Sequence, residues 1–91
     1  MKVLIFGKGK DVESQITKCL NFAMIHGIDE AETVSNMPQA IERLSKRDIN
    51  AVLIANMNVV ADDEFEYEII ESTFARYRAK LIIVKGELAW Y

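Results

Sequence analysis

The feature that most constrains the fold is a run of five apolar residues, Ala51 to Ala55, near the middle of the chain. Asn50 and Asn56 bound the run. A continuous apolar run of this length is typical of a strand that is buried on both faces of a parallel sheet. In open α/β sheets, ligands bind beyond the carboxyl ends of such central strands. We therefore expect the functional site near Asn56.

Other segments of the chain alternate between strand and helix patterns. Further strands are predicted at Lys2–Phe6, at the more polar Asp29–Val34, which suits an edge, and at Lys80–Lys85. Helices are predicted from Val12 to just before Gly27, after a cap at Asn36, and after a cap at Asp62 or Asp63. This order predicts a three-layer α/β sandwich with right-handed crossovers. Its four-stranded parallel sheet has the flavodoxin-like order 2-1-3-4, in a single domain spanning residues 1–91.

Composition narrows the class of protein. Apolar residues make up 51% of the 91 residues, and the net charge of −3 gives no basic excess for a nucleic-acid surface. The single Cys19 rules out a disulfide framework and fits a reducing, cytoplasmic location. The apolar runs are strand-length, so no membrane segment is expected. No pattern of residues predicts a metal site, a cofactor site or a catalytic triad.

Four segments together resemble the receiver domain of bacterial two-component response regulators. KVLIF followed by Gly7-Lys8 resembles the first receiver strand and the site of its acidic pair, and EAETVSNMPQAIERL resembles the second strand and helix. AVLIANMN resembles the third strand, with Asn56 in place of the phosphoryl-accepting aspartate, and LIIVK resembles the fourth, with Lys85 where receivers carry Thr or Ser. The resemblance covers the whole chain, which corresponds to a receiver without its fifth strand and last helix.

The departures from the receiver pattern decide the function that this resemblance implies. An amide at Asn56 is not a phosphoryl acceptor, and Lys8 would repel the divalent cation that receivers need. The resemblance therefore implies a pseudo-receiver that is neither phosphorylated nor an enzyme. Its expected function is a receiver-like regulatory or signalling module that acts through protein–protein interaction.

Ligand binding at the strand ends is the second matter that the sequence raises. The candidate residues are Lys8, Gly9, Lys10, Asn56, Asn58 and Lys85. Asn56 also fits a purely structural role, in which its side chain satisfies loop backbone groups, and strand-end lysines are commonly only solvated. As an alternative function, the Gly7-Lys8-Gly9 turn suits a nucleotide- or phosphate-binding half-Rossmann domain, although Val12 occupies the third glycine position.

Association with a protein partner, most simply a second copy as a homodimer, follows from the apolar residues near the carboxyl end of the chain. The third helix carries one stripe with Tyr67, Ile70, Phe74 and Tyr77, and an adjacent one with Phe65 and Ile69. Only one stripe is needed to pack on the sheet. An unpaired fourth strand would add Leu81 and Ile83, and the tail would add Trp90 and Tyr91. We assign the first stripe, the strand residues and the tail aromatics to the partner surface.

Overall fold

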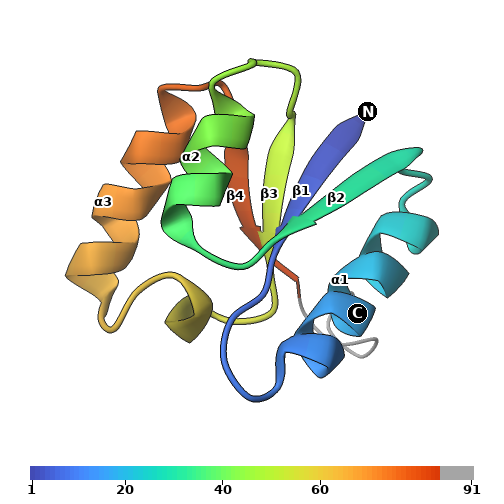
Figure 1. Cartoon of the computed structure of the whole chain (residues 1–91), viewed down its shortest axis with the longest axis horizontal. Coiled ribbons are helices and arrows are strands. Elements are labelled where there is room, and N and C mark those ends of the chain that lie inside the picture. The colour runs from blue at the N-terminus through green and yellow to red at the C-terminus, as the bar shows by residue number, and fades with distance from the viewer. Residues whose placement is uncertain (85–91) are drawn as a thin grey trace.

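The computed structural model of the chain describes residues 1–84 as a parallel sheet between two layers of helices (Figure 1). The strands are β1 (Lys2–Phe6), β2 (Glu30–Val34), β3 (Ala51–Ile54) and β4 (Lys80–Ile83). Their order is β2-β1-β3-β4, and every neighbouring pair is parallel. This arrangement confirms the predicted fold class and strand order. The fourth strand ends at Ile83, and Lys85, Trp90 and Tyr91 lie outside the described residues.

The helices follow their predicted starts. They are α1 (Val12–Ile25), α2 (Met37–Leu44) and α3 (Glu64–Ala75), with a 3₁₀ turn, η1 (Met57–Val59), after β3. Asn36 caps α2 by accepting a hydrogen bond from the Gln39 amide at 2.9 Å. At α3, Asp63 accepts from the Glu66 amide, and the Glu66 carboxylate accepts from the Asp62 amide, both at 2.8 Å. These reciprocal bonds fix where α3 begins.

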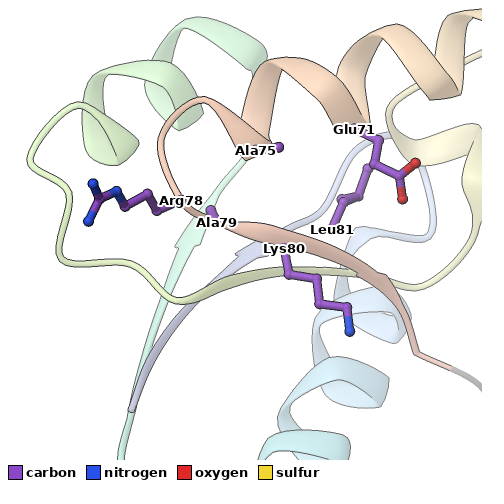
Figure 2. Close-up of a pocket in the computed structure, with 6 residues that line it drawn as sticks. All are labelled: Glu71, Ala75, Arg78, Ala79, Lys80 and Leu81. Atoms are coloured by element: carbon purple, nitrogen blue, oxygen red, sulfur yellow. The ribbon is translucent and has the colours of Figure 1, made fainter.

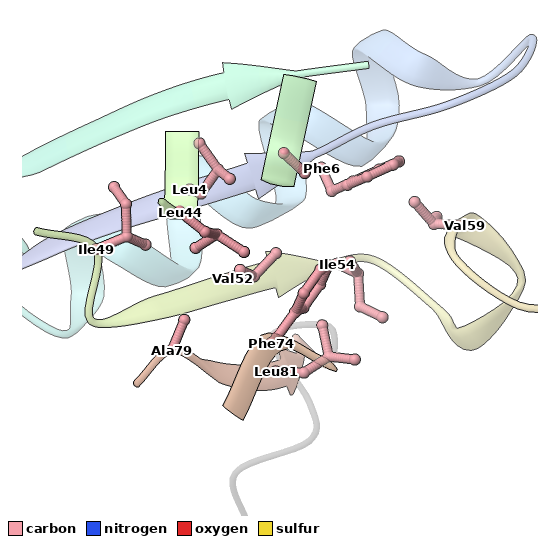
Figure 3. Close-up of a cluster of buried hydrophobic side chains, with 11 residues drawn as sticks. Leu4, Phe6, Leu44, Ile49, Val52, Ile54, Val59, Phe74, Ala79 and Leu81 are labelled. Carbon is pink, nitrogen blue, oxygen red and sulfur yellow. The ribbon is translucent and has the colours of Figure 1, made fainter. Parts of the chain in front are cut away.

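The two faces of the sheet bury two separate apolar clusters. Strand residues with one orientation, such as Val3, Ile5 and Leu53, pack with Cys19 and Ala23 of α1. Their alternate neighbours pack against α2 and α3 on the other face, because successive strand side chains point to opposite faces. Figure 3 shows this second cluster, in which Phe74 lies among Val52, Ile54 and Leu81. Both clusters are completed by helices, so β1 and β3 are held as the rigid centre of the molecule.

The orientation of α3 differs from the one assigned to its stripes. Phe74 is fully buried, and Tyr67, Ile70 and Tyr77 pack partly buried against the same cluster. Leu81 is only 5% exposed. The first stripe therefore lies against the sheet, and the stripe that faces solvent is that of Phe65 and Ile69, which are 73% and 50% exposed. Among the residues assigned to a partner surface, Ile83 on β4 remains exposed within residues 1–84.

Three other properties of the described residues bear on function. Within residues 1–84, no helix has both the length and the apolar character needed to cross a bilayer. Over the same range, no three His, Cys, Asp or Glu side chains are placed to hold a metal ion. Burial raises the pKa of the Cys19 thiol to about 11, so this buried side chain behaves as an apolar core residue.

Candidate functional site at the carboxyl edge of the sheet

The carboxyl ends of β1 and β3 form the point where the strand order reverses direction. From β1 the chain crosses through α1 to β2 on one side, and from β2 it crosses back through α2 to β3 on the other side. At such a point the loops leave neighbouring strands in opposite directions, and in open α/β sheets this is where ligands bind. The loop from Gly7 to Asp11 and the turn η1 therefore flank the candidate site.

The loop after β1 is held in shape by Gln15 of α1. The Gln15 side chain accepts a hydrogen bond from the Lys8 amide at 2.8 Å and donates one to the Lys8 carbonyl at 2.9 Å. Gly7 is buried, and its amide donates to the Val34 carbonyl of β2. With its backbone pinned at both points, the loop presents Lys8, Gly9 and Lys10 to solvent. The contribution of Gln15 was missed by sequence reasoning, because a polar residue in an exposed first turn of a helix carries no distinguishing signal.

Gly9 and Asp11 complete this loop. Gly9 has a φ of +91°, a conformation that glycine adopts without strain. Asp11 is the N-cap of α1, but its side chain makes no capping hydrogen bond to the first turn. The amides at the start of α1, which form the positive end of the helix dipole, therefore lie beside two exposed lysines. Asp11 and Glu13 also lie at this corner, so any attraction of anions here depends on the two lysines and the helix amides.

The turn after β3 supplies the second side of the candidate site. Asn56 is exposed, has an extended backbone and makes no side-chain cap to η1; its carbonyl accepts from the Val59 amide at 3.2 Å. Asn58 lies exposed within η1. The Asn56 side chain is therefore available for a ligand and does not cap the turn. Lys85 lies outside the described residues, so its place among the candidate ligand-binding residues remains a prediction.

A separate cluster of charged residues, which the sequence analysis did not find, joins β1, β2 and α2. The Arg43 guanidinium donates to both oxygens of Glu32, at 2.7 and 2.6 Å, and to both oxygens of Asp48, at 2.7 and 3.1 Å. The Lys2 ammonium lies 3.1 Å from Glu32 and 3.3 Å from Asp48. Hydrogen bonds from Arg43 and then Lys2 lower the pKa of Glu32 from its usual value near 4.5 to about 2. The partners come from four segments, so only the folded register reveals them.

This charge cluster predicts how stability depends on pH. Because the folded-state pKa of Glu32 is lowered, its contribution is fully present above pH 4.5 and is lost as the pH falls toward about 2. Arg43→Gln removes the main cause of the lowered pKa. We expect this variant to melt below the parent protein at pH 7, and the gap between their melting temperatures to narrow between pH 4.5 and about 2. Arg47→Gln, at an exposed position just after α2, is the control. A gap that stays constant with pH would contradict the assignment.

A groove of about 300 Å³ between α3 and β4 is a different surface feature (Figure 2). Its walls include Glu71, Ala75, Leu81 and Lys80, and it lies at the amino end of β4, away from the crevice. Figure 2 shows the side chains of Arg78, Lys80 and Glu71 pointing in different directions. Because its polar groups do not converge, we do not assign a ligand to this groove.

Comparison with known proteins gives matches in structure only. No protein-family model and no curated protein sequence matches the chain. The fold is similar to the C-terminal catalytic domain of ISC1926 TnpA, an IS607-like serine recombinase, with a TM-score of 0.80 and 19% identity over 94% of this chain and 71% of that one. The N-terminal catalytic domain of TP901-1 integrase gives 0.74 and 13%, covering 92% and 77%. The C-terminal catalytic domain of IS1535 TnpA, another IS607-like serine recombinase, gives a TM-score of 0.71 and 11% identity over 93% of this chain and 72% of that one.

These matches correct the family resemblance drawn from the sequence. The similar structures are catalytic domains of serine recombinases and an integrase, so the resemblance to response-regulator receivers is wrong. The expectations that depended on it, a pseudo-receiver with a regulatory signalling function that is not an enzyme, are overturned with it. The half-Rossmann alternative has no support either. A parallel sheet of order 2-1-3-4 is common to several classes, so strand patterns alone did not separate them.

Proposed function

We propose that this chain is a recombinase-type domain that acts in DNA recombination. The observation that carries the proposal is the match of 94% of the chain to a serine-recombinase catalytic domain with a TM-score of 0.80. At 19% sequence identity this match establishes a shared fold, and the function is our inference from that fold. The proposal departs from the expectation that the chain has no nucleic-acid partner, which rested on net charge averaged over the whole chain.

The DNA contact in this proposal is the loop between β1 and α1. Lys8 and Lys10 are exposed there, beside the uncapped start of α1, and cations together with a helix N-terminus suit phosphate groups. The start of α3 also lies at this edge but carries Asp62, Asp63 and Glu64. The start of α1 also carries two carboxylates, Asp11 and Glu13, but Lys8 and Lys10 balance them, so we place the DNA on the side of α1.

Reversal of the loop charges tests this DNA contact. We expect Lys8→Glu with Lys10→Glu to weaken DNA binding about tenfold or more and to flatten its salt dependence, because two phosphate contacts are lost. The matched control is Lys46→Glu with Arg47→Glu, which makes the same change in charge at exposed positions after α2. Fluorescence anisotropy with a labelled duplex at several salt concentrations measures both. Equal losses in the two double variants would count against the loop, and no binding by the parent protein would count against the function.

The chemical part of the proposal concerns serine hydroxyl groups at the same edge. Ser14 lies in the first turn of α1, and Ser35 lies between β2 and α2, where its hydroxyl is 3.4 Å from the Gln39 side-chain oxygen. Incubation with nicked and intact duplex DNA, followed by denaturing electrophoresis, detects a covalent protein–DNA species. Loss of that species in Ser14→Ala or in Ser35→Ala would identify the attacking hydroxyl. Retention of DNA without a covalent species would instead assign the chain a DNA-holding role.

The partner in this proposal is a second copy of the chain. Support comes from the exposed apolar side chains of Phe65 and Ile69 on α3 and of Ile83 on β4. Burial of these side chains between copies removes apolar surface from water, which favours association. Light scattering at increasing protein concentration tests it, and a constant monomer mass would exclude it.

A further inference from the structure

The solvent-facing side of α3 carries a stripe of four residues at helical spacing. Phe65, Ile69, Ser72 and Arg76 follow one another at intervals of four, three and four along the helix and its C-cap, and all four are exposed. The opposite side of the helix carries Phe74 into the core. We call these four residues the outer stripe. Figure 1 shows α3 at the outside of the helical layer formed with α2, and α3 also contacts β4.

The outer stripe is complementary to itself when two helices run antiparallel. A two-fold axis through the midpoint between Ile70 and Glu71 pairs position 65 with position 76, and the same axis pairs position 69 with position 72. The first pair sets the Arg76 guanidinium of one copy against the Phe65 ring of the other, a favourable cation–π contact. The second pair sets the larger Ile69 against the small Ser72, which lets the helices approach closely. Both pairs therefore fit one symmetric interface.

The distribution of charge along α3 selects the antiparallel orientation. Three of its four glutamates, Glu64, Glu66 and Glu68, lie in its first half, and Arg76 is its C-cap. An antiparallel pair brings the acidic half of each helix beside the basic end of the other, and it also opposes the two helix dipoles. A parallel pair would bring the carboxylates of the two copies together, which is unfavourable.

We propose that two copies of this chain associate through the outer stripes of α3, packed antiparallel about a two-fold axis. The inference rests on the self-association proposed above and assigns its surface. Only two apolar side chains per copy enter the contact, so the buried area falls below the roughly 1,200 Å² typical of stable complexes. The dimer is therefore weak and depends on protein concentration, and assembly on a shared DNA would raise its effective concentration.

Charge reversal at the end of the outer stripe tests the surface. We expect Arg76→Glu to raise the dimer dissociation constant at least about tenfold, because it places an acidic group against the acidic half of the second copy. Glu68→Arg combined with Arg76→Glu exchanges the two charges and is expected to regain most of the affinity. Arg78→Glu makes the same change in charge off the stripe and is the matched control, expected to stay near the parent value. Sedimentation velocity over roughly a hundredfold range of protein concentration measures all four proteins.

A second variant separates the contact from general charge effects. Phe65→Ala removes the ring that Arg76 packs on in the second copy, so it is also expected to weaken the dimer while circular dichroism stays unchanged. A parent protein that is monomeric throughout the range would overturn the proposal, and would leave the outer stripe to another partner. Equal effects of Arg76→Glu and Arg78→Glu would overturn it too, as would failure of the double variant to recover. Arg76→Glu keeps both loop lysines, so its DNA binding, measured by anisotropy at concentrations where the parent is monomeric, is expected to equal that of the parent protein. This measurement distinguishes a failure of the dimer proposal from a failure of the proposed DNA function.

Discussion

Replacement of Phe74 by alanine is expected to lower the free energy of unfolding by about 3–5 kcal/mol, the range for removing an aromatic ring from a core. Phe74 is fully buried in the cluster that joins α3 to Val52, Ile54 and Leu81. The surrounding strands belong to the sheet and cannot collapse into the space that the ring leaves. A domain of this size has a total stability of about 5–10 kcal/mol, so the variant retains little of it.

Phe65 provides a matched control for that prediction. Phe65→Ala removes the same atoms from the same helix, but its side chain is 73% exposed, so the cost is expected to stay within about 0.5 kcal/mol. Urea denaturation followed by circular dichroism gives both free energies and their m-values. Similar losses for the two variants would contradict the orientation of α3, on which the outer stripe depends.

The fold was predictable because strand and helix patterns are strong and local in this chain. The run from Ala51 to Ala55 and KVLIF are continuous apolar segments. The helical stripes between the strands are bounded by capping residues or a glycine. The more polar Asp29–Val34 segment was assigned to an edge, and β2 is an edge strand. Short connections with right-handed crossovers then leave few strand orders. The order 2-1-3-4 follows from these steps.

The family and the surface were not predictable to the same degree. The strand order and the crevice it creates occur in several classes of protein, so an asparagine after the third strand was interpreted against the wrong class. On α3, Tyr67 and Phe74 form a stripe as apolar as that of Phe65 and Ile69, and only packing against β3 and β4 decides which faces inward. A hydrophobic pattern gives the period of a helix but not its rotation when two apolar stripes adjoin.

Polar contacts between distant segments were equally beyond the sequence. Arg43 reaches Glu32 eleven residues earlier and Asp48 five residues later, and their meeting depends on the parallel register of β1 and β2. Gln15 reaches Lys8 because α1 packs back over the end of β1. The Gln15 contact holds α1 to the loop after β1, and the Arg43 contacts hold α2 to β2. Each requires the tertiary arrangement that sequence patterns give only in outline.

Gly7 connects the stability of the core to the shape of the candidate site. It is buried where β1 leaves the sheet, and a Cβ at this position would lie 2.9 Å from the Val12 Cγ2 atom and 3.2 Å from the Ile16 Cγ1 atom. The first distance is shorter than real contacts allow, so the Val12 side chain, α1 or the loop must shift. A movement of α1 or of the loop also displaces the backbone of Lys8, which Gln15 clamps to α1.

Gly7→Ala is therefore expected to cost about 1–3 kcal/mol of unfolding free energy, as for other additions to a packed interior. Val12→Ala removes the Cγ2 atom that obstructs the new methyl group, so the double variant is expected to lose less than the sum of the two single losses. Denaturant titration of the four proteins gives this coupling energy, and DNA anisotropy on the same samples reports the loop. Because Gly7→Ala displaces the clamped loop, it should also weaken DNA binding, and the double variant should recover part of it. Additive losses in stability would show that the contact between Gly7 and Val12 does not set the position of α1.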